Sequence, residues 1–186
     1  MTMLRDIAIA AFFLWMCVDS VFVFRHATGA AENRDRFSLK LIMIGSLATL
    51  WISIGLAFGT IATMQSVPVQ VAGLVVMGVG IVVRSTAIAQ LGRFHTPNVA
   101  VRTDHELKTS GLYGIVRHPS YLGALIAYLG LGLALGNWLS LAVIIGIVPC
   151  LYLYRIHEED AAMLAAFGDV YRAYCARTKR LIPWVY

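Results

Sequence analysis

The residues best suited to chemistry form two polar groups, each beside a long apolar stretch. The first is Arg117-His118-Pro119, directly before the apolar run that begins at Tyr121. Pro119 favours the first turn of a helix, where its missing amide hydrogen costs nothing. A helix start leaves amide donors free and carries partial positive charge, and Arg117 and His118 add donors. This group is suited to holding an anion at a membrane surface. The alternative is that these residues anchor the helix at the interface, with Tyr121 in an aromatic belt.

The second group contains Arg155 and Glu159, which follow the next apolar run. They are four residues apart, so on a helix they lie on the same face. Arg155 is suited to an anion, and Glu159 to a cation or a hydroxyl group in the same pocket. The alternative is that Arg155 is an interfacial anchor and that the acidic residues 158–160 compensate the dipole of a helix start.

Composition places both groups in a membrane protein. Of the 186 residues, 59% are hydrophobic and only 13% are charged, and the mean hydropathy is +0.75. Soluble domains carry about 25% charged residues, and a domain of this size has too little interior to bury so much apolar surface. These values argue against a soluble enzyme or a disordered chain. They favour an all-α integral membrane protein.

Five apolar stretches predict membrane-spanning helices, since a span needs about 20 residues. Residues 1–186 then form one membrane-embedded domain, with spans at about 7–24, 41–64, 67–88, 119–136 and 138–155. The last two stretches are separated at Gly136-Asn137, which predicts a tight helical hairpin; one long kinked helix is the alternative. Apolar residues at three- and four-residue spacing then predict an amphipathic helix at about 157–178.

The basic residues support this arrangement. Fourteen of the 15 fall in the segments 25–40, 84–117 and 155–180, on one side of a five-span chain, and only Arg5 falls on the other. The positive-inside rule then predicts an outer N-terminus and a cytosolic C-terminus. This distribution explains the net charge of +5 without a nucleic-acid partner. The three scattered cysteines have no metal-ligand spacing, so we expect no metal site.

The two polar groups and their surroundings resemble the isoprenylcysteine carboxyl methyltransferases and related membrane methyltransferases, including phospholipid N-methyltransferases. The resemblance covers about residues 98–183. It rests on the segment 105–123 and on a later set of residues in the expected order: Arg155, Glu158, Glu159, Phe167, Gly168, Tyr171, Tyr174 and Pro183. The first three predicted spans match in hydrophobic character alone.

The resemblance implies that S-adenosylmethionine binds at the cytosolic face, between the connection of spans 3 and 4 and the C-terminal amphipathic helix. The implied cofactor-binding residues are Asn98, His105, Leu107, Lys108, Tyr113, His118, Pro119, Ser120, Tyr121 and Glu159. The implied catalytic residues are Arg155, facing the carboxylate of the acceptor, and Arg117, which either binds ligand or braces the two motifs. The acceptor is a lipophilic molecule that enters from the bilayer. The implied membrane is the inner membrane in a bacterium or the endoplasmic reticulum in a eukaryote.

The chemistry of these residue types agrees with that cofactor. Donors from His118 and the helix start suit its carboxylate, and Glu159 suits its ammonium or ribose hydroxyls. The rings of Tyr113 and Tyr121 suit its adenine or its sulfonium. Arg155 favours an anionic acceptor, such as an isoprenylcysteine carboxylate, over a phospholipid amine.

Some alternatives stay open at this stage. The chain is either a methyltransferase, a nicotinamide-dependent membrane reductase, since some sterol reductases have similar C-terminal spans, or a non-catalytic membrane protein. Gly78 and Gly80 either bring a ligand close to the backbone or allow close helix packing. Asp19 is either hydrated near the interface or has a partner within the membrane.

Overall fold

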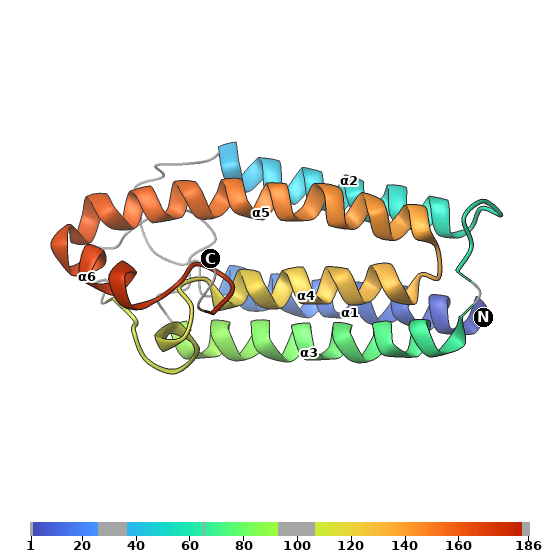
Figure 1. Cartoon of the computed structure of the whole chain (residues 1–186), viewed down its shortest axis with the longest axis horizontal. Helices are drawn as coiled ribbons and strands as arrows, with labels where there is room; N and C mark the ends of the chain where they lie inside the picture. Colours follow the sequence, from blue (N-terminus) through green and yellow to red (C-terminus); the bar gives the residue numbers. More distant parts are fainter. Residues whose placement is uncertain (1, 26–36, 65, 93–106, 184–186) are drawn as a thin grey trace.

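The helices form two groups that lie along a common direction. The computed structural model describes residues 2–25, 37–64, 66–92 and 107–183. Its helices are α1 (Thr2–Arg25), α2 (Phe37–Ala57), α3 (Val67–Leu91), the short 3₁₀ helix η2 (Gly111–Gly114), α4 (Pro119–Ala134), α5 (Trp138–Phe167) and α6 (Asp169–Arg177). Helices α1, α3 and α4 pack together, α2 packs along α5, and α6 lies beyond one end of the bundle (Figure 1).

Three of the described helices, α2, α3 and α5, are long and apolar enough to cross a membrane. Helix α4 is apolar but has 16 residues, and α1, with 24 residues, is not among the three. The all-helical fold is therefore confirmed over the described ranges, whereas five spans stay a prediction. The hairpin of α4 and α5 is confirmed, because the chain turns at Gly136, whose φ is +67°.

Two helices end at different residues from those that the apolar pattern predicts. Helix α2 ends at Ala57, because residues 58–64 turn back and pair with the α4–α5 turn: the Met64 amide donates to the Gly136 carbonyl (2.7 Å). Helix α5 continues without a break to Phe167, so the predicted amphipathic helix is divided at Gly168, whose φ is +53°. A backbone at this positive φ favours glycine and ends the helix.

Asn137 joins the two turns at the end of the bundle near the N-terminus. Its side chain is almost fully buried and donates to the carbonyls of Leu56 (3.2 Å) and Ile61 (2.8 Å). Its side-chain oxygen accepts from the amide of Ser140 (3.0 Å), which caps the start of α5. One side chain therefore bonds to backbone groups of α2, of the turn that follows it and of the first turn of α5.

Replacing Asn137 by alanine is expected to lower the free energy of unfolding by about 2 kcal/mol, because two backbone carbonyls and one helix-start amide lose their hydrogen-bond partner. The apparent Tm of the purified protein in detergent would fall by about 5 °C. Ser66→Ala is the control, since Ser66 begins α3 without a side-chain capping bond. Equal Tm values for the two variants would contradict the role given to Asn137.

Helices α3 and α4 approach each other backbone to backbone. A Cβ added to Gly80 would lie closer than 3.0 Å to backbone atoms of Ala127 and Gly123. By contrast, a Cβ on Gly78 would meet no described atom within 4 Å. Gly80 therefore serves close helix packing, which is the use of small residues that membrane helices favour. Gly78 has no such role in the contacts described.

Asp19 has a partner, because both of its carboxylate oxygens accept from Arg84 of α3, at 2.7 Å each. The two side chains are only 16% and 13% exposed. Arg84 also donates to the carbonyl of Ser120 in the first turn of α4 (3.4 Å). This ion pair therefore fixes α1, α3 and the start of α4 together.

Candidate functional site

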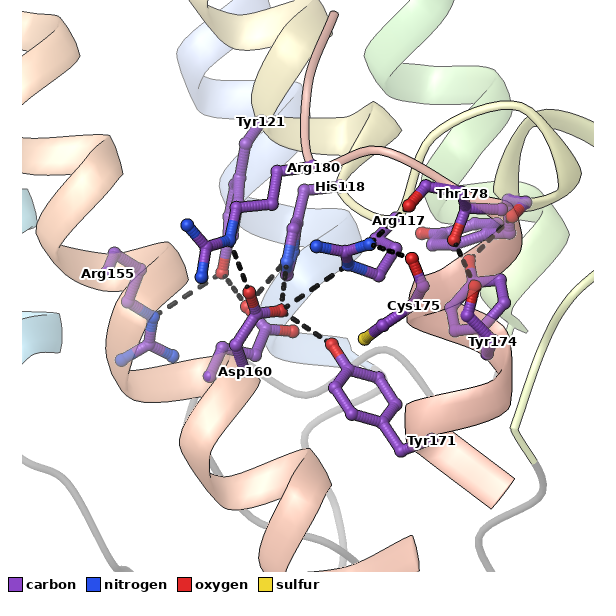
Figure 2. Close-up of polar contacts among 12 residues, drawn as sticks. Arg117, His118, Tyr121, Arg155, Asp160, Tyr171, Tyr174, Cys175, Thr178 and Arg180 are labelled. Carbon is purple, nitrogen blue, oxygen red and sulfur yellow. Dashed lines mark hydrogen bonds and ion pairs between the residues drawn. The ribbon is translucent and has the colours of Figure 1, made fainter. Parts of the chain in front are cut away.

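The segment before α4 is held by the segment that follows α6. The amide of Arg117 donates to the carbonyl of Lys179 (2.8 Å), and the amide of His118 donates to that of Arg180 (3.0 Å). Val116 and Lys179 form an isolated parallel bridge. The C-terminal segment thus lies beside the start of α4, and it brings its own side chains to the Arg117-His118 motif (Figure 2).

Tyr121 connects the two residues that the sequence places on one face of a helix. Its hydroxyl donates to Glu159 Oε2 (2.6 Å) and accepts from Arg155 Nε (3.4 Å). Arg155 is 3% exposed and also donates from Nη1 to the Ser38 hydroxyl of α2 (2.6 Å). The Glu159 side chain keeps 33% exposure. The expectation that Arg155 and Glu159 share a face is confirmed, and together with Tyr121 they place a cation, a hydroxyl and an anion in contact.

His118 lies against the same tyrosine. The two rings are stacked, with centroids 5.6 Å apart and planes 11° apart. The His118 side chain is 6% exposed, and its Nδ1 lies 3.9 Å from Glu159 Oε2. The motif at the start of α4 and the polar end of α5 are therefore in contact.

Asp160 is the residue of this site that the sequence analysis did not single out. Its Oδ1 lies 2.8 Å from His118 Nε2 and accepts from the Tyr171 hydroxyl (2.5 Å), while Oδ2 accepts from Arg180 Nε (2.8 Å) (Figure 2). The alternative interpretation of the sequence was that the charges of residues 158–160 compensate the dipole of a helix start. That alternative is wrong for Asp160, because α5 is continuous and Asp160 lies within it.

Arg117 braces the C-terminal segment. Its Nη1 donates to the carbonyls of Cys175 and Thr178, and its Nε lies 3.9 Å from Asp160 Oδ1. These contacts show that Arg117 holds the C-terminal segment in place. Its Nε is a buried donor without a hydrogen-bond acceptor among the described residues.

Tyr113 of η2 is fixed between two parts of the chain. Its hydroxyl donates to the Ala87 carbonyl of α3 (3.4 Å), and its own carbonyl accepts from the Tyr174 hydroxyl (2.6 Å). Burial raises the pKa of the Tyr113 hydroxyl above its ordinary value, and burial raises the pKa of Tyr174 to about 12. Both phenols are therefore neutral donors at physiological pH, so these contacts persist.

The remaining predicted residues are distributed as follows. Pro119 begins α4 and Ser120 follows it, and both are buried. Leu107 and Lys108 lie before η2 and are half-buried. Asn98 and His105 lie outside the described residues. In the part of the chain that the structure describes, no group of three or more His, Cys, Asp and Glu side chains could hold a metal ion.

The chain is similar to known membrane methyltransferases. Residues 71–165 match the sequence model of the isoprenylcysteine carboxyl methyltransferase family. A protein-S-isoprenylcysteine O-methyltransferase of Schizosaccharomyces pombe is 35% identical over 118 residues, which are 62% of this chain and 50% of that protein. Protein-S-isoprenylcysteine O-methyltransferase B of Arabidopsis thaliana is 35% identical over 115 residues, which are 61% of this chain and 58% of that protein. The matched region thus spans little more than half the length of these relatives.

A solved structure is also similar. The eukaryotic intramembrane Ras methyltransferase, an isoprenylcysteine carboxyl methyltransferase, superposes with a TM-score of 0.62 and 26% sequence identity. The superposition covers 77% of this chain and 52% of that one. Because its described helices include three that are long and apolar enough to cross a membrane, and because the solved structure that it resembles is that of an intramembrane methyltransferase, the chain is an integral membrane protein.

Proposed function

The chain belongs to the isoprenylcysteine carboxyl methyltransferase family, and from this premise we propose that it transfers a methyl group from S-adenosylmethionine to a lipophilic acceptor. The observation that carries the proposal is the contact of Arg155 and Glu159 with one hydroxyl, that of Tyr121. Two motifs that are far apart in the chain meet there, and they bring both charges that such a reaction needs to position its two substrates.

The chemistry of this donor and acceptor set fits the cofactor. Glu159 is one-third exposed and offers a carboxylate to an ammonium or to ribose hydroxyls. Arg117 Nε is a buried donor without an acceptor among the described residues, and the first turn of α4 leaves amide donors for a carboxylate. The stacked rings of His118 and Tyr121 offer an apolar face with a polar edge. When bound, S-adenosylmethionine supplies an electrophilic methyl group on its positively charged sulfur.

Arg155 suits the other substrate. A buried guanidinium that is held by Ser38 and Tyr121 has a fixed orientation, and its planar fork matches a carboxylate. A carboxylate already has a free electron pair, so its methylation needs alignment rather than a general base. We therefore propose an isoprenylcysteine-like carboxylate as the acceptor, with Arg155 as the residue that positions it.

The site lies at the end of the bundle where the described basic residues other than Arg5 gather. By the positive-inside rule this end faces the cytosol and the N-terminus lies outside. The acceptor then enters laterally from the bilayer, while α6 and the C-terminal segment cover the site from the water. The membrane is the inner membrane in a bacterium or the endoplasmic reticulum in a eukaryote.

Binding of S-adenosylhomocysteine to the purified protein, measured by calorimetry, tests the proposal. We expect micromolar affinity in the wild type and a loss of tenfold or more, about 1.4 kcal/mol, in Glu159→Ala. Glu158→Ala is the matched control, because it removes the same charge one position away on the helix. If folded wild-type protein does not bind, or if both variants lose affinity equally, the proposed use of Glu159 is wrong.

A second assay identifies the acceptor. Transfer of a labelled methyl group is measured with a prenylated cysteine, a prenyl-thiol acid and phosphatidylethanolamine offered separately. We expect labelling of the first two, as base-labile esters. Labelling of the phospholipid alone would replace the carboxylate proposal by N-methylation, and binding of NADPH without S-adenosylhomocysteine would indicate a reductase.

A further inference from the structure

The contacts of Asp160 bear on which ring nitrogen of the neighbouring His118 carries a proton. An arginine side chain can only donate hydrogen bonds, and Arg180 Nε lies 2.8 Å from Asp160 Oδ2. The Tyr171 hydroxyl donates to Oδ1. Burial and the hydrogen bond to Asp160 raise the pKa of the Tyr171 hydroxyl above its ordinary value, so this phenol keeps its proton. Asp160 is therefore an ionised carboxylate that accepts hydrogen bonds from Tyr171 and Arg180.

It follows which nitrogen of His118 carries the proton. Nε2 lies 2.8 Å from Asp160 Oδ1, and a carboxylate that only accepts requires a donor at that distance. In the neutral imidazole the other nitrogen, Nδ1, is then an acceptor. Nδ1 lies 3.9 Å from Oε2 of Glu159, the carboxylate that we propose to bind the cofactor.

We propose that Asp160 is a positioning residue that holds His118 as the Nε2–H tautomer and so presents Nδ1, beside Glu159, as an acceptor for a hydrogen-bond donor of the ligand. This inference rests on the proposed function where it names a ligand. It changes the role expected from the sequence, in which His118 donates a hydrogen bond to the cofactor. Two acceptors 3.9 Å apart suit a ligand group with two or more N–H or O–H bonds.

Asp160 is held in place by two side chains from outside α4 and α5. Tyr171 lies in α6 and Arg180 lies in the C-terminal segment, and both donate hydrogen bonds to Asp160. The backbone of His118 is tied to the same segment through the carbonyl of Arg180. The orientation of the imidazole is therefore coupled to the docking of the C-terminal segment.

The test reads the tautomer directly. Protein labelled with ¹⁵N-histidine is studied in detergent at pH 8, above the ordinary histidine pKa of about 6.5. The chain has five histidines, and the resonances of His118 are identified by their loss in His118→Gln. We expect a proton on Nε2 in the wild type and loss of this single tautomer in Asp160→Asn, because a side-chain amide can donate as well as accept.

Affinity for S-adenosylhomocysteine is measured on the same samples. We expect Asp160→Asn to bind about tenfold more weakly, as is typical when a hydrogen bond to a charged group is lost. Arg172→Gln is the control, because it removes an exposed ion pair of α6 with Asp169. It is expected to change neither the tautomer nor the affinity.

A proton on Nδ1 in the wild type would overturn the inference, and this result needs no folded variant of Asp160. A change of tautomer without a change of affinity would overturn it too, as would a loss of affinity with the tautomer unchanged. Failure of the wild type to bind S-adenosylhomocysteine would instead reject the proposed function. The tautomer comparison alone would then decide what Asp160 does to His118.

Discussion

Gly80→Val is expected to destabilise the protein by about 3 kcal/mol or more, because a side chain at this position has no space. Even its Cβ would overlap backbone atoms of Ala127 and Gly123, which cannot move without separating α3 from α4. The apparent Tm in detergent, followed by tryptophan fluorescence, would fall by about 10 °C. Separation of these helices would also disturb Arg84, which holds the carbonyl of Ser120.

Gly78→Val is the matched control. It makes the same change two residues away on the same helix, where a Cβ would meet no described atom within 4 Å. Valine is slightly better than glycine in a helix, so this variant should be as stable as the wild type. A similar fall in apparent Tm in both variants would mean that α3 requires backbone flexibility at these glycines and not close packing against α4.

Arg155→Lys is expected to lower kcat/KM for the prenylated acceptor about 100-fold, because an ammonium cannot reproduce a planar guanidinium in a bidentate, oriented contact. Affinity for S-adenosylhomocysteine should change by less than about threefold, since Glu159 keeps its carboxylate and its exposure. Methyl transfer is measured at varied acceptor concentration to obtain kcat/KM. Calorimetric binding of S-adenosylhomocysteine gives the cofactor affinity separately.

Ser38→Ala and Arg172→Lys test whether orientation is the cause. The hydroxyl of Ser38 accepts from Arg155 Nη1 (2.6 Å), so its removal should lower kcat/KM about tenfold while the guanidinium remains. Arg172 is 70% exposed, and its replacement by lysine should have no effect. A fall in cofactor affinity that equals the fall in kcat/KM would assign Arg155 to the cofactor rather than to the acceptor.

The local pattern of the sequence was sufficient for the class of fold and for part of the site. Apolar composition predicts helices in a membrane, and Gly136-Asn137 predicts the hairpin of α4 and α5. The four-residue spacing of Arg155 and Glu159 places them on one face, because helix geometry depends only on neighbours along the chain. That the motif at residues 117–121 contacts this face of the helix was predicted only from the resemblance to a known family.

Other features depend on contacts between residues that are far apart in the chain. Asp19 and Arg84 are 65 positions apart in the chain. Whether Asp19 is hydrated or paired with Arg84 depends on how α1 packs against α3. Gly78 and Gly80 both have apolar neighbours in the sequence, yet only Gly80 lies on the face of α3 that packs closely against α4.

Asp160 shows most clearly the difference between what the sequence determines and what the tertiary structure determines. By itself the sequence determined that an acidic residue follows Glu159, one position further along the helix. Only the tertiary structure decided that this residue meets His118, Tyr171 and Arg180, because α6 and the C-terminal segment fold back beside the start of α4. A carboxylate acquires its partners from whichever segments pack around it. Helix periodicity determines the direction in which the side chain points, but long-range packing determines what it meets.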